Sequence, residues 1–111
     1  MTSTELMGLL ESLYLWLDGN FNSLFKCCMD DTQRGLLRKA YVNARDNYWE
    51  ARNRVFHEND PLVAQAAQEL ANTKSEIDQF QIEESNIAAI LGLIANAVHL
   101  GSSLITLGSG V

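Results

Sequence analysis

The chain has 111 residues, of which 47% are hydrophobic, so it is long enough for one domain with a modest core. Eight basic and fourteen acidic residues give a net charge of -6, which argues against the basic surface that a nucleic-acid partner requires. The two cysteines, Cys27 and Cys28, are adjacent and cannot form an unstrained disulfide, which indicates a reducing compartment. No Lys or Arg precedes the first apolar run, so we expect a cytoplasmic protein, with non-classical export or membrane association as alternatives.

The N-terminal part of the chain predicts a first helix over about residues 4–28. Thr2 and Glu5 have the spacing of a capping box, and leucines follow at helical intervals. These leucines are Leu6, Leu9, Leu10, Leu13 and Leu17. We therefore expect one face of this helix to be buried.

Two further helices are predicted on either side of the segment HENDP, residues 57–61. Asp30 and Gln33 repeat the capping spacing before a second helix over about residues 31–58. Pro61 suits the first turn of a third helix over about residues 61–107. No alternating β-branched run or Asn-Gly turn predicts a strand. The expected fold class is all-α, with one domain spanning residues 1–111.

The second and third helices carry apolar residues at alternating spacings of three and four, the pattern of a coiled-coil seam. The first seam contains Leu37, Tyr41, Ala44, Tyr48, Ala51 and Val55, and the second contains Ala66, Leu70, Thr73, Ile77, Phe80, Glu84, Ile87, Leu91, Ile94 and Val98. Two seams joined by a short turn predict a long antiparallel helical hairpin. Counted from the turn, this register places Arg34 in one layer with Glu84. The first helix either runs collinear with the second or folds back to make a three-helix bundle.

The C-terminal segment 86–111 contains no Asp, Glu, Lys or Arg. It is apolar on nearly every helical face, and residues 87–107 are long enough to cross a bilayer. Membrane insertion of this segment is therefore one alternative. Asn96, His99 and the lack of flanking basic anchors favour close helix packing instead.

Charged residues form two rows with a seven-residue repeat. The arginine row is Arg38, Arg45 and Arg52, and the glutamate row is Glu69, Glu76 and Glu83. In the predicted hairpin the two rows lie on opposite edges, so they cannot neutralise each other within one molecule. Stacked copies would bring the arginine row of one against the glutamate row of the next, which makes a head-to-tail interface. The alternative is that both rows are simply solvated.

Apolar residues add candidates for contact with a partner. A second apolar row on the second helix needs a cover, which is either the first helix or another protein. It contains Val42, Trp49 and Phe56. The C-terminal segment contributes Ile90, Leu93, Leu100 and Leu104.

No catalytic arrangement is evident in the sequence. His57 and His99 are far apart, and no HExxH, GxSxG or phosphate-binding loop occurs. Glu50, His57 and Glu58 lack the paired Glu-x-x-His motifs of di-iron bundles. We therefore expect neither an enzyme nor a bound metal or cofactor.

The Asn59-Asp60-Pro61 turn between two predicted helices resembles the hairpin of type III secretion needle and inner-rod subunits. This resemblance covers the turn and the helix after it, and it implies architecture only: small helical hairpins that stack into tubes. The charge-free C-terminal segment departs from needle subunits, whose C-terminal segment is usually mixed in charge.

The expected function is non-enzymatic association with a second copy or with another protein, as a self-assembling subunit, adaptor or chaperone, with a role in secretion suggested by the resemblance. One alternative is a membrane-associated protein that inserts residues 87–107. A second alternative is a small acidic inhibitor or immunity protein that masks a basic partner.

Overall fold

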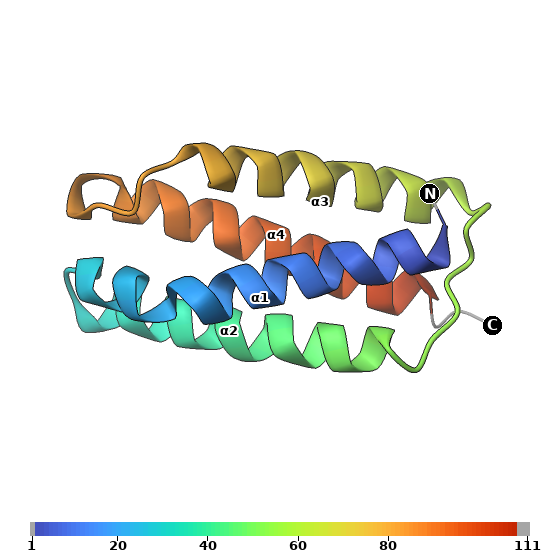
Figure 1. The fold of residues 1–111 in the computed structure, drawn as a ribbon, viewed down its shortest axis with the longest axis horizontal. Helices are drawn as coiled ribbons and strands as arrows, with labels where there is room; N and C mark the ends of the chain where they lie inside the picture. Colours follow the sequence, from blue (N-terminus) through green and yellow to red (C-terminus); the bar gives the residue numbers. More distant parts are fainter. Residues whose placement is uncertain (1, 109–111) are drawn as a thin grey trace.

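The computed structural model describes residues 2–108, which form an all-α bundle (Figure 1). Four α-helices and one short 3-10 helix account for most of this range, so the predicted fold class is confirmed. The elements are α1 (Ser3–Cys27), α2 (Asp31–Ala51), α3 (Pro61–Gln79), η1 (Glu84–Asn86) and α4 (Ile87–Gly108).

Helix α1 follows the sequence prediction closely. The Thr2 side chain accepts from the Glu5 backbone N–H, and the Glu5 carboxylate accepts from the Thr2 backbone N–H, so the predicted capping box is formed. One face of α1 is buried in the core. Its fully covered side chains are Leu6, Leu10, Leu13, Leu17 and Leu24.

Helix α2 begins as predicted but ends at Ala51, seven residues before the predicted boundary. Asp30 caps its start by accepting from the backbone N–H of Gln33 at 2.8 Å. Beyond the helix end the chain must cross the bundle, and Phe56 turns into the core with 3% of its surface exposed. A continued helix over residues 52–58 could not make this crossing, so tertiary burial overrides local helix propensity.

The predicted third helix, 61–107, is two helices. Pro61 begins α3 as expected, but α3 ends at Gln79 and Phe80 adopts an extended backbone with ψ of 141°. The chain then reverses through η1 and returns as α4. A continuous helix would leave the apolar segment after Glu84 without a cover, whereas the reversal packs α4 along α3 and buries Ile87, Ile90 and Ile94.

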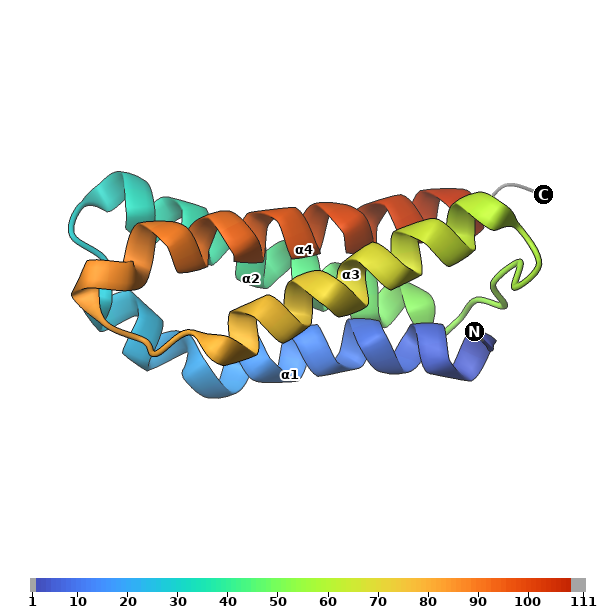
Figure 2. The same cartoon turned by 90° about the horizontal axis from the view of Figure 1, so that it is seen from above.

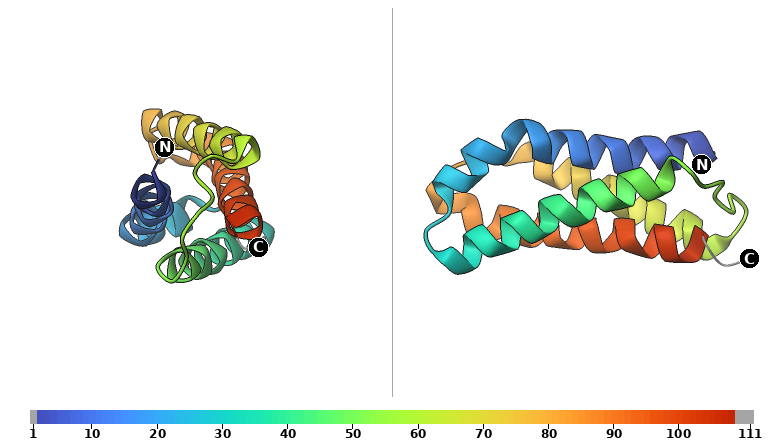
Figure 3. Two further views of the ribbon diagram at one scale, coloured as in Figure 1. Left: turned by 90° about the vertical axis from the view of Figure 1, so that its right-hand side faces the viewer. Right: turned by 90° about the horizontal axis from the view of Figure 1, so that it is seen from below.

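The helices alternate in direction along the chain, and α2 and α3 lie at opposite corners of the bundle. Helix α2 contacts α1 and α4, whereas α3 contacts α4 and α1. The end-on view shows segment 52–60 crossing diagonally from α2 to α3 (Figure 3). The antiparallel hairpins are therefore α1/α2 and α3/α4, as the view from above also shows (Figure 2). The predicted hairpin between the second and third helices is wrong.

The Arg34–Glu84 layer depended on that hairpin and is not formed as predicted. Arg34 instead pairs within its own helix, with its Nη1 atom 2.8 Å from Asp31 Oδ1. Glu84 is exposed in η1. Of the two arrangements left open for the first helix, folding back is the one observed: α1 packs antiparallel against α2, in a bundle of four helices rather than three (Figure 1).

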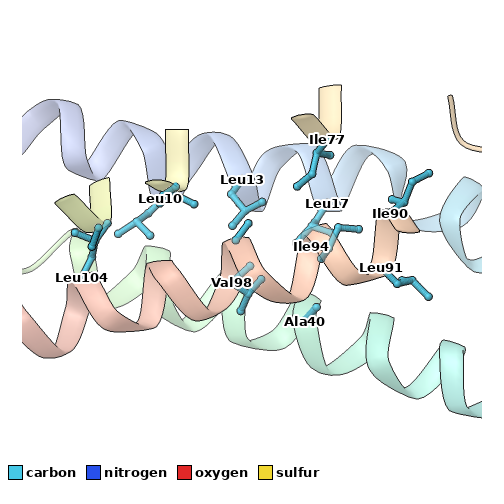
Figure 4. Packing of buried hydrophobic residues seen from close by; sticks show 14 of the residues in the cluster. Leu10, Leu13, Leu17, Ala40, Ile77, Ile90, Leu91, Ile94, Val98 and Leu104 are labelled. Carbon is cyan, nitrogen blue, oxygen red and sulfur yellow. The ribbon is translucent and has the colours of Figure 1, made fainter. Parts of the chain in front are cut away.

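The core is a row of aliphatic side chains to which all four helices contribute (Figure 4). At its centre, Ile94 of α4 lies among Leu17 of α1 and Ile77 of α3, and all three are at most 1% exposed. The charge-free segment thus supplies the most apolar wall of the core. This burial explains why the inner face of the segment carries no charge.

Helices α1, α2 and α4 pack closely together at Gly101. A Cβ atom there would lie 2.9 Å from Cδ2 of Leu10 and 3.3 Å from Nδ2 of Asn47. Beside it, the Asn47 amide donates to Ser102 Oγ at 3.1 Å, which ties α2 to α4 with a polar contact. The glycine is therefore required by packing between helices and not by backbone conformation.

Candidate functional site

Six aromatic rings form a continuous ladder along the seam between α1 and α2. Consecutive ring centroids are 5.2 to 6.0 Å apart, within the range of favourable aromatic pairing. In order along the seam, the aromatic ladder contains Phe25, Phe21, Tyr41, Tyr14, Tyr48 and Trp49. All but Trp49 are half-buried, so the ladder is a partly apolar strip that reaches the surface.

Hydrogen bonding and burial raise the pKa values of two tyrosines in the middle of the ladder. The Tyr41 hydroxyl donates to Asp18 Oδ1 at 2.7 Å, and this bond is the main reason that the pKa of Tyr41 lies well above its ordinary value. Burial, followed by the nearby Glu11 carboxylate, also raises the pKa of Tyr48. Both phenols therefore keep their protons to a higher pH than an ordinary tyrosine does.

Arginines cover both ends of the aromatic ladder. At one end the Arg38 guanidinium lies 5.0 Å from the Phe25 ring centroid. At the other, the Arg52 guanidinium lies 4.9 Å from the Trp49 ring. Such cation–π contacts hold a guanidinium at a defined position without neutralising it. Among residues 2–108, neither Arg38 nor Arg52 has a carboxylate in ion-pair contact.

Two apolar side chains lie exposed within the same surface. Trp49 is 52% exposed and Val42 is 40% exposed, and both stand on the outer side of α2 between members of the arginine row. Arg45, the middle member, reaches only the neighbouring Asp46, at 3.7 Å. We define the α1/α2 face as the aromatic ladder, the arginine row and Val42.

The glutamate row lies on the other side of the molecule. Glu69 and Glu76 are exposed on α3, which is at the opposite corner of the bundle from α2 (Figure 3). Glu83 is exposed beyond the end of α3, where it precedes η1. The two rows are therefore separated within one molecule, as predicted, but because of a diagonal arrangement and not because of hairpin edges.

Three of the predicted contact residues belong to the core instead of the surface. Phe56, Ile90 and Leu104 are at most 3% exposed, because each fills the interior between helices. Leu93 and Leu100 are half-buried against the same core. In the intact bundle these side chains are covered by the chain itself, whereas Val42 and Trp49 are not.

The first helix covers the second apolar row only in part. The backbone N–H of Phe56 donates to Ser3 Oγ at 2.9 Å, so the start of α1 docks beside Phe56. The Ser3 N–H is in turn bound by the Glu58 carboxylate. Val42 and Trp49 remain outside this contact, which leaves them as the surface members of the row.

The outer side of α4 is uncharged. By length and composition, residues Glu84–Leu107 could cross a membrane, with mean hydropathy of 1.7. Half of the most apolar window is buried inside the bundle, and core helices of soluble proteins pass the same test of length and composition. The residues that face outward are small or polar, and they include Ala88, Gly92, Ala95, Asn96 and His99.

A shallow groove of about 300 Å³ runs between α2 and α4. Leu36, Ala40 and Val98 supply apolar walls, and Lys39 and His99 are its titratable residues. Ser102 also lines the groove, and its Oγ hydrogen-bonds to the Asn47 amide. Within residues 2–108 no group of three or more His, Cys, Asp or Glu side chains is placed to hold a metal ion.

The two cysteines lie at the end of α1, where Cys27 is half-buried and Cys28 is buried. Burial raises the pKa of the Cys28 thiol, and the thiol donates to the Leu24 carbonyl at 3.4 Å. A protonated, buried thiol is a poor nucleophile.

The sequence interpretation missed the aromatic ladder. Tyr14, Phe21 and Phe25 recur at spacings of seven and four on α1, and Tyr41 and Tyr48 recur at seven on α2. These spacings place each set on one helix face, but only the pairing of α1 with α2 joins the sets.

Comparisons with protein-family models, curated proteins and solved structures find no match to this chain.

Proposed function

We propose that this chain is a non-enzymatic protein-association module that binds a partner through the α1/α2 face. The observation that carries the proposal is the exposure of Trp49 and Val42 between the arginines of the row. Of these arginines, Arg45 has a carboxylate partner at the long distance of 3.7 Å, and the other two have none in ion-pair contact among the described residues. Trp and Arg are the residues most enriched among energetically dominant interface positions. Trp49 already contacts the Tyr48 ring and the Arg52 guanidinium, and side chains that are ordered before binding lose less entropy on association.

The chemistry of the face specifies an acidic partner surface with some apolar content. Three guanidinium groups offer forked donors to carboxylates, and the exposed indole offers a flat apolar contact. Six of the eight basic residues fall within residues 31–54, although the whole chain has a net charge of -6. The α1/α2 face is thus the place on an acidic protein where a second acidic surface can dock.

Site-specific photocrosslinking tests this proposal. A benzophenone side chain placed at position 42 should form a covalent adduct with a protein in the cells that produce the chain. The matched control places the same group at position 12, where Ser12 is exposed on the far side of α1. Adducts at position 42 that disappear when Trp49→Ala and Arg45→Glu are added support the proposal. No adduct at position 42, or equal adducts at both positions, would contradict it.

Membrane insertion by α4 is the second candidate function, and its uncharged outer side favours it. Insertion requires α4 to leave the bundle, which exposes the core side chains of the other three helices to water. Flotation with anionic and zwitterionic vesicles distinguishes the two functions. Recovery of the chain with vesicles at neutral pH would support insertion, and recovery in the soluble fraction would leave association through the α1/α2 face.

A further inference from the structure

We infer that the acidic surface that docks on the α1/α2 face is the α3/α4 face of a second copy of this chain. This inference rests on the proposed function and names its partner. It starts from the distribution of charge, since residues 58–84 carry seven acidic residues and one basic residue. These residues include α3 and its glutamate row, on the corner diagonally opposite to α2 (Figure 3).

The two charged rows have matched spacings. Arg38 and Arg45 on α2 are seven residues apart, as are Glu69 and Glu76 on α3, and seven residues on a helix span about 10.5 Å. Because α2 and α3 run in opposite directions, two copies in the same orientation bring Arg38 toward Glu76 and Arg45 toward Glu69. The same register carries Arg52 and Trp49 toward Leu62, which is 59% exposed near the start of α3. A single sideways displacement of one copy therefore brings opposite charges together and also brings exposed apolar residues together.

The carboxylates of the glutamate row are free to accept such contacts. Within residues 2–108 neither Glu69 nor Glu83 takes part in an ion pair; Gln65 Nε2 donates to Glu69 Oε1 at 3.3 Å, and Ser85 Oγ donates to Glu83 Oε2 at 3.4 Å. Within the described part of the chain, Glu76 takes part in no ion pair. The one lysine of α3, Lys74, forms an ion pair with Asp78, with its Nζ atom 2.7 Å from Asp78 Oδ1, and it also lies over the Trp16 ring.

The neighbouring surface of α4 suits close approach. It presents Ala89, Gly92 and Asn96 outward, with no charged residue to oppose the arginines. The bundle measures 42 by 22 by 19 Å, so one long side offers on the order of 800 Å², the area per partner of a standard stable interface. One long side of the bundle is thus large enough for a specific contact between copies.

The two surfaces are different and lie on opposite sides, so the contact is heterologous. Each added copy leaves one α1/α2 face and one α3/α4 face unoccupied, which gives open chains or closed rings and not a two-fold dimer. Association should weaken as salt screens the charges.

Charge reversal with mixing tests the inference. The first variant carries Arg38→Glu and Arg45→Glu, and the second carries Glu69→Arg and Glu76→Arg. Each variant alone has like charges on both faces, so its self-association should fall at least about tenfold, because like charges across an interface cost several kcal/mol. An equimolar mixture should regain assembly, since each face of one variant then complements the opposite face of the other.

The matched control carries Lys26→Glu and Lys39→Glu, which makes the same change in net charge away from the arginine row. Sedimentation velocity at low and high salt reports assembly, and circular dichroism reports that all variants keep their helix content. The inference is supported if the control assembles like the wild type, each charge-reversed variant alone loses assembly, and the mixture of the two variants recovers it. A wild-type chain that stays monomeric at high concentration and low salt, or a mixture that fails to recover, would overturn it. Adducts at position 42 with a different protein would then still support the proposed function.

Discussion

The Tyr41 hydroxyl on α2 donates a hydrogen bond of 2.7 Å to the Asp18 carboxylate on α1. This contact joins the two helices at the middle of the aromatic ladder and places a negative charge next to a phenol. The folded chain therefore holds the Tyr41 proton at a pH at which the unfolded chain, with the ordinary pKa of 10.0, has lost it.

The first prediction concerns this proton. Above pH 10.0 the unfolded chain binds fewer protons than the folded chain, so the free energy of unfolding should fall as pH rises. Asp18→Asn should lower the pKa of Tyr41 and make this fall less steep. Tyrosinate absorbance and chemical unfolding at several alkaline pH values measure both effects. Asp46→Asn is the control, and an equal change in that variant would contradict the assignment.

The second prediction concerns the packing of α4 against α1 and α2. Gly101→Ala places a methyl group 2.9 Å from Leu10, a buried side chain with little room to move, so overpacking should cost about 1–3 kcal/mol. Gly92→Ala is the control, because no atom lies within 4 Å of the added methyl group. There the helix propensity of alanine should stabilise the chain by about 0.5–1 kcal/mol. Equal unfolding free energies for the two variants would show that α4 is not packed in this way.

The third prediction concerns the reversal between α3 and α4. Ser75→Pro removes a backbone donor inside α3 and should destabilise the bundle by about 3 kcal/mol. Gln81→Pro lies in the non-helical segment and follows Phe80, whose extended backbone suits a residue before proline, so it should cost less than about 1 kcal/mol. Thermal unfolding of the two variants provides the comparison. Equal large losses would favour one continuous helix over residues 61–107.

The helix starts could be predicted because their signals are local. Each of three helix starts is fixed by residues close together in the sequence, namely Thr2 with Glu5, Asp30 with Gln33, and Asp60 with Pro61. The reversal at residues 80–83 contains neither proline nor glycine, and the apolar spacing continues through it. Only the burial of α4 against α3 decides that break. The pairing of α1 with α2 likewise depends on the whole bundle.

Some parts of the candidate site could likewise be predicted from local spacing, and other parts depend on the whole bundle. The arginine row follows from spacing on one helix, and its three members are exposed. For Val42 and Trp49 the sequence left two covers open, the first helix or another protein, and the first helix leaves both side chains exposed. The interior positions of Ile90 and Leu104 were not predicted, because an all-round apolar helix gives no indication of which side faces the core. The aromatic ladder required knowledge of which helices are neighbours.

Trp49 fluorescence tests the central claim most directly, namely that the α1/α2 face is occupied when the protein associates. Trp16→Phe leaves Trp49 as the sole tryptophan, and its half-exposed indole should emit at long wavelength in dilute solution. As concentration rises at low salt, the emission should shift to shorter wavelength, and added salt should reverse the shift. Adding Arg45→Glu should abolish the concentration dependence. Emission that stays unchanged while sedimentation shows assembly would place the interface elsewhere and contradict the account.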